Sequence, residues 1–172
     1  MAEPLKPGDL APSFRLQPVF GLPVEIPGRV SLLLFLRPLG SANTRSMLAA
    51  LQSVHRELDG IQVVQFTRSS LLLAQDFVPR QHLLLPLVCD PAGEWYARYG
   101  VGANLLASLL KPAAILRYPQ RLSLGHGKPE APYGQQAAAL VVGADGRVRW
   151  AWYGKGIFDL PEVSMLLEAL RA

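Results

Sequence analysis

Leu32-Leu33-Leu34-Phe35-Leu36-Arg37-Pro38-Leu39-Gly40-Ser41-Ala42-Asn43-Thr44-Arg45 is the stretch that decides the fold. The apolar run up to Leu36 ends in turn residues, which is typical of a strand buried on both faces. Ser41 then stands at the N-cap of a predicted helix, because Met47, Leu51, Val54 and Leu58 recur at helical spacing before Asp59-Gly60. The stretch therefore brings a helix N-terminus, with its partial positive charge and free N–H groups, to the carboxyl edge of a sheet. Open α/β sheets usually place their sites there.

Two further strand–helix pairs follow along the chain. The first strand is a β-branched run, and its helix has Ser69 as a predicted cap and Pro79 as a predicted stop. The second strand ends at Cys89 before an Asp-Pro turn, and Gly100 closes its helix. The predicted strands cover 61–67 and 84–89, and the predicted helices cover 70–78 and 94–99.

The two ends of the chain predict β-hairpins and a closing helix. Short strands at 14–16 and 24–26 flank Phe20-Gly21, and strands at 137–143 and 147–153 flank the tight turn at Asp145-Gly146. On the last strand, strict alternation places Val148, Trp150 and Trp152 on one face and Arg147, Arg149 and Tyr153 on the other. A final helix begins near Pro161 and presents Val163, Leu166, Leu167 and Leu170 on one side.

This order of elements predicts an α/β fold of the thioredoxin-like type. Two parallel β-α-β crossovers are followed by an antiparallel hairpin and a helix. We expect a central mixed sheet with helices on both faces and an N-terminal β extension. A length of 172 residues with 50% hydrophobic content fits a single domain over 1–172.

Three motifs carry a resemblance to a known family. They are Phe35-Leu36-Arg37 with Gly40 and Arg45, the opening Gly8-Asp9-Leu10-Ala11-Pro12-Ser13-Phe14, and Asp90-Pro91 followed by Tyr96-Ala97-Arg98-Tyr99-Gly100-Val101. Together they resemble the peroxiredoxin-like branch of the alkyl hydroperoxide reductase/thiol-specific antioxidant (AhpC/TSA) superfamily. Leu124-Gly125-His126 and Gln135-Gln136 resemble that branch's long insertion, which makes 103–136 a candidate lid.

The resemblance implies an antioxidant oxidoreductase, but its Cys-x-x-Cys positions fall on Ser41 and Thr44. Hydroxyls cannot form a sulfenic acid or a disulfide at these positions. The remaining thiol, Cys89, ends an apolar strand, where a small buried core residue is the default and a reactive thiol is the alternative. A hydrolytic Ser41 would need a base, and His55 lies about 20 Å along the predicted helix. The sequence leaves His82 and His126 open as bases, although capping alone accounts for Ser41.

We therefore expect a family member that has lost the thiol reaction and keeps a binding or scaffolding role. One alternative is a thiol-dependent peroxidase or reductase that uses Cys89. Another is a module that binds a small anion or carboxylate ligand at the helix N-terminus, through Arg37, Ser41, Thr44 and Arg45. Arg37 and Arg45 could instead pair with acidic surface residues.

Charge and composition bear on partners and location. Lys and Arg exceed Asp and Glu by 17 to 13 but are scattered, which argues against nucleic-acid binding. No apolar run approaches the length of about 20 residues that spans a bilayer, and no secretory signal is evident. A single cysteine agrees with a cytoplasmic location. No metal or cofactor is predicted, and Trp150 with Trp152 would form a homodimer surface if they are exposed.

Overall fold

The computed structural model describes residues 2–103, 134–156 and 159–172. Its main sheet has five strands in the order β5-β4-β3-β6-β7, and a two-stranded β1-β2 sheet accompanies it. β4 is parallel to β3 and β5 is parallel to β4, whereas β6 and β7 run antiparallel to their neighbours. The strands are β1 (Phe14–Leu16), β2 (Val24–Ile26), β3 (Ser31–Phe35), β4 (Gln62–Thr67), β5 (Leu87–Cys89), β6 (Ala138–Val142) and β7 (Val148–Tyr153).

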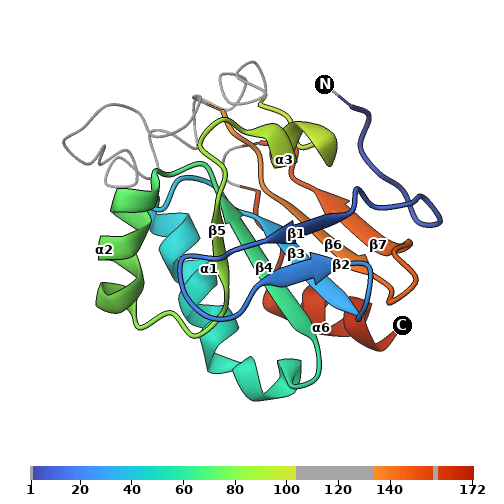
Figure 1. The fold of residues 1–172 in the computed structure, drawn as a ribbon, viewed down its shortest axis with the longest axis horizontal. Helices are drawn as coiled ribbons and strands as arrows, with labels where there is room; N and C mark the ends of the chain where they lie inside the picture. The colour runs from blue at the N-terminus through green and yellow to red at the C-terminus, as the bar shows by residue number, and fades with distance from the viewer. Residues whose placement is uncertain (1, 104–133, 157–158) are drawn as a thin grey trace.

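Both faces of the main sheet are buried, as the apolar run in β3 predicts. Leu32 and Leu34 pack into one core, beneath α1 (Ala42–Ser53), α2 (Leu71–Gln81) and α6 (Val163–Arg171). Leu33 and Phe35 pack into a second core on the opposite face, beneath the β1-β2 hairpin and α3 (Glu94–Arg98). Figure 1 shows the hairpin in front of the main sheet. The predicted mixed sheet with helices on both faces and an N-terminal β extension is confirmed.

Two helices differ from the prediction. The first ends at Ser53, and a 3-10 helix, η1 (His55–Leu58), follows it. The cap of α2 is Ser70 rather than Ser69, since the Ser70 hydroxyl accepts a hydrogen bond from the N–H of Leu73 at 3.3 Å. Pro79 does not stop α2, which continues to Gln81. Because Pro79 lies in the last turn, its missing N–H removes a single bond close to where the helix ends.

The predicted face assignment on β7 is wrong because of a β-bulge. The pairing register with β6 shifts between Val141 and Val142, which pair with Trp150 and Val148. Arg149 is the extra residue, so alternation is interrupted. Val148 therefore packs into the hairpin-side core, whereas Trp150 packs on the helix side.

The candidate lid, 103–136, is described only at its two ends. Ala103 and Gln135 form an isolated antiparallel bridge, and the N–H of Gln136 donates to the carbonyl of Gly102 at 3.1 Å. The rest of the segment lies outside the described residues. Within the described part of the chain, no helix has the length and apolar character needed to cross a membrane.

Candidate functional site

The carboxyl ends of β3 and β4 are joined by a buried tyrosine. The hydroxyl of Tyr96, in α3, lies 2.5 Å from the carbonyl oxygen of Leu36 and 2.8 Å from that of Phe66. Burial, followed by the charge of Asp90, raises the pKa of Tyr96 well above its usual value, so the hydroxyl stays a neutral donor. Asp90 holds α3 in place, because its carboxylate accepts from the N–H groups of Glu94, Trp95 and Tyr96 at 2.9, 2.8 and 3.2 Å.

The N-terminus of α1 lies one turn beyond the end of β3. Ser41 occupies the N-cap position with extended backbone, as predicted, but its hydroxyl makes no capping hydrogen bond. That part of the prediction is wrong. The carbonyl of Ser41 accepts from the N–H of Arg45 at 3.1 Å, which starts the helical ladder. Within the described residues, the N–H groups of Ala42, Asn43 and Thr44 have no hydrogen-bond partner.

Thr44 and Arg45 make contacts within the turn itself. Thr44 is buried, and its hydroxyl donates to the carbonyl of Arg37 at 3.3 Å. Arg45 is exposed and donates from Nη1 to the carbonyl of Gly40 at 2.9 Å. No carboxylate pairs with Arg45 in the described part of the chain. The four predicted binding residues therefore surround one turn, but the Thr44 hydroxyl is directed into the protein.

Arg68, which the sequence alone did not indicate, shares a partner with Arg37. Arg37 donates from Nε to the backbone carbonyl of Gln135 at 3.0 Å, and burial lowers the Arg37 pKa. Arg68, just beyond β4, donates from Nη1 to the Gln135 side-chain oxygen at 3.1 Å and from Nη2 to the carbonyl of Ala92 at 3.2 Å. One buried glutamine thus holds two guanidinium groups. The missed signal was the placement of Gln135, 67 residues after Arg68.

Cys89 lies apart from the N-terminus of α1. It ends β5 opposite Thr67 of β4, so β4 separates it from β3, which leads into α1. Its side chain is half-buried against the helix-side core, and burial raises the pKa of its thiol. A neutral, partly enclosed thiol is a poor nucleophile.

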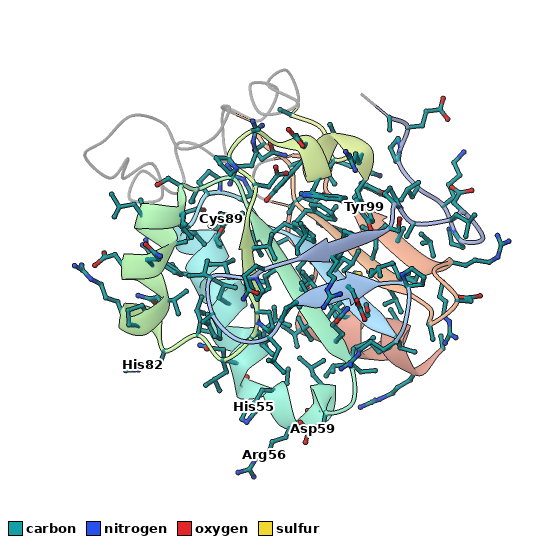
Figure 2. All side chains as sticks on the ribbon, viewed as in Figure 1. His55, Arg56, Asp59, His82, Cys89 and Tyr99 are labelled. Atoms are coloured by element: carbon teal, nitrogen blue, oxygen red, sulfur yellow. The ribbon has the colours of Figure 1, made fainter. Side chains whose placement is uncertain are left out.

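The described histidines lie far from Ser41. His55 follows the C-terminus of α1, whose 12 residues span about 18 Å. His82 follows the C-terminus of α2, whose 11 residues lead about 16 Å away from the carboxyl end of β4. Figure 2 shows His55 and His82 in the lower part of the view, below Cys89. His126 is outside the described residues. Neither His55 nor His82 is placed to act as a base for Ser41, and no group of His, Cys, Asp or Glu that could hold a metal ion occurs among the residues described.

No protein-family model matches the chain, and no curated protein matches it. Among solved structures it is similar to the peroxidoxin BcpB from Mycobacterium tuberculosis, at 16% identity and a TM-score of 0.71, with 97% of each chain covered. A peroxiredoxin-like protein from Aquifex aeolicus is 14% identical with a TM-score of 0.72, covering 99% of this chain and 88% of that one. M. tuberculosis AhpC is 14% identical with a TM-score of 0.71, covering 98% of this chain and 92% of that one. The chain therefore has the thioredoxin-like fold seen in peroxiredoxins.

Proposed function

We propose that this protein is a peroxiredoxin-like chain without thiol peroxidase activity that keeps a binding role at the carboxyl edge of its sheet. One observation carries the proposal: Ser41 stands at the N-cap of α1 and Thr44 lies in its first turn, and these are the positions to which the resemblance assigns the family's two cysteines. Peroxide reduction needs a thiolate that becomes a sulfenic acid, and an alcohol cannot follow that course.

The competing function is a peroxidase or reductase that uses Cys89. Three features weigh against it. Cys89 is half-buried, burial raises its thiol pKa, and it lies on the second strand away from β3. In addition, Cys89 has no cysteine partner, because the chain contains only one cysteine.

Peroxide consumption with a thiol reductant separates the two functions. Wild type and Cys89→Ala are compared at equal concentration against the reductant alone, with hydrogen peroxide and an organic hydroperoxide. We expect both proteins to match the background rate. Turnover by the wild type that disappears in Cys89→Ala would overturn the proposal.

The proposal also includes a cytoplasmic location and a homodimer, each with its own basis. The location rests on the single cysteine, which leaves the chain without an internal disulfide. The homodimer rests on β7, an edge strand of the main sheet that carries the half-buried Trp150 and Trp152. Sedimentation of the wild type and Trp152→Lys tests it: a dimer that the substitution splits supports this surface, and a wild-type monomer overturns it.

A further inference from the structure

Two arginines leave neighbouring strands at the same edge of the sheet. Phe35 of β3 pairs in register with Phe66 of β4, and Arg37 and Arg68 each follow two residues later. The Tyr96 hydroxyl ties these two strand ends together. The backbone positions from which the two arginine side chains extend are therefore fixed by the core.

Gln135 determines how both arginines are held. It is 2% exposed, and its side-chain nitrogen donates to the carbonyls of Gly102 and Gln136 at 3.0 and 3.2 Å. Its side-chain oxygen is thereby turned toward Arg68, and its backbone oxygen accepts from Arg37. Both acceptors of Arg68, the Gln135 side chain and the carbonyl of Ala92, are neutral, so they orient this guanidinium without cancelling its charge.

No carboxylate pairs with Arg68 among the described residues, whose ion pairs are Arg15–Glu25, Asp76–Arg80 and Glu57–Arg171. Besides burial, the charge of Asp90 raises the pKa of Tyr96, and that of Arg68 lowers it. The carboxylate oxygens of Asp90, however, accept hydrogen bonds from the N–H groups at the start of α3 and not from Arg68. The buried Nε of Arg68 has no acceptor. The guanidinium lies flat against Gly93, where an added Cβ would be 2.7 Å from Cζ.

We infer that Arg68 and Arg37 form the binding site for the oxyanion group, carboxylate or phosphate, of a small ligand. This inference rests on the proposed binding function and names its ligand class. The planar fork of arginine matches carboxylate and phosphate oxygens. Arg68 is a partly buried cation held by neutral acceptors, with Arg37 on the neighbouring strand end, and this favours an anion over a neutral or cationic group. The unpartnered N–H groups at the start of α1 add positive potential to the same edge.

Thermal melting with defined probes tests the site. Wild type is melted in sodium phosphate, sodium acetate and sodium chloride at matched ionic strength. We expect the melting temperature to rise by at least 2 °C above chloride, with saturation at millimolar concentration, in phosphate or in acetate. The anion that stabilises more identifies which oxyanion the site prefers. Equal melting temperatures in all three salts would overturn the inference.

Variants assign the effect to these residues. Arg68→Gln should remove the anion-specific rise, and Arg68→Lys should keep only part of it, because lysine is a point charge without a fork. Arg80→Gln is the matched control, since Arg80 is exposed and pairs with Asp76. An anion effect that persists in Arg68→Gln would place the site elsewhere and refute the assignment.

A second readout covers an Arg68→Gln variant that does not fold. In ¹⁵N-labelled wild type, the Nε–H signals of Arg37 and Arg68 should move on titration with the stabilising anion, whereas that of Arg80 should not. Unmoved Arg37 and Arg68 signals would refute the site. These measurements contain no peroxide, so turnover through Cys89 would overturn the proposed function without affecting this result.

Discussion

Replacing Ser41 with cysteine, in a Cys89→Ala background, should create a thiol with a lowered pKa. The new sulfur would stand at the N-cap of α1, where the hydroxyl makes no capping bond and three backbone N–H groups lack partners. A thiolate can accept those N–H groups, and the helix end stabilises negative charge. The variant therefore tests whether the fold still provides the electrostatics of a thiol site while lacking only the sulfur.

The size of the shift follows from the helix end. A negative charge beside a helix N-terminus gains about 0.3–1 kcal/mol when exposed and up to about 2 kcal/mol when partly buried. Ser41 is half-buried, so about 1–2 kcal/mol applies. Since one pKa unit corresponds to about 1.4 kcal/mol, the thiol should titrate near 7–8 instead of about 8.5.

Alkylation by iodoacetamide as a function of pH measures this pKa. Ser46→Cys in the same background is the matched control, because Ser46 is exposed on the same helix beyond its first turn. Its pKa should stay near 8.5. If Ser41→Cys titrates at or above the control, the helix end is not available to a ligand or a thiolate, and the reasoning fails.

Three further predictions concern stability. Tyr96→Phe removes the hydroxyl that donates to the Leu36 and Phe66 carbonyls. This should lower the free energy of unfolding by about 2 kcal/mol and the melting temperature by about 4–8 °C. A change under 1 °C would contradict a stabilising role for this hydroxyl. Gly93→Ala forces a side chain onto φ +76° and into Arg68, so it should lower stability by about 1–2 kcal/mol and weaken the anion-specific melting shift, both read from melting curves. Burial raises the pKa of Tyr153 to about 12 from its unfolded value near 10, so stability is retained below pH 10 and lost as pH rises toward 12. Melting temperatures from pH 9 to 12 check this loss, which should be smaller in Tyr153→Phe.

Much of the fold could be predicted from local patterns. The 14–16 and 24–26 strands occur at those residues, and the Asp145-Gly146 turn joins β6 and β7 as predicted. These signals are short-range: turn residues, alternation and apolar runs specify each element where it stands. The prediction that Pro79 stops α2 was wrong, because the effect of a proline depends on its distance from the end of the helix, and the sequence does not show where that end lies.

The site was less predictable because its contacts are long-range. Arg37 and Ser41 were predicted from a motif around one turn. Arg68 could not be assigned to the site from the sequence, because only its hydrogen bond to the distant Gln135 places it there. The bulge at Arg149 was not predicted for a similar reason, because an extra residue in one strand can be recognised only from its pairing with the neighbouring strand. Pairwise placement of this kind belongs to the tertiary structure.

The bridge between Ala103 and Gln135 brings two backbone segments together at the edge of the domain. Because these segments pair with each other, their positions on the sheet do not depend on how many residues connect them. For a flexible connection, each doubling of its length raises the free energy of loop closure by only about 0.6 kcal/mol. Evolution, or a protein engineer, can therefore exchange the residues between Ala103 and Gln135 for a shorter or different sequence while the β-strand framework stays intact.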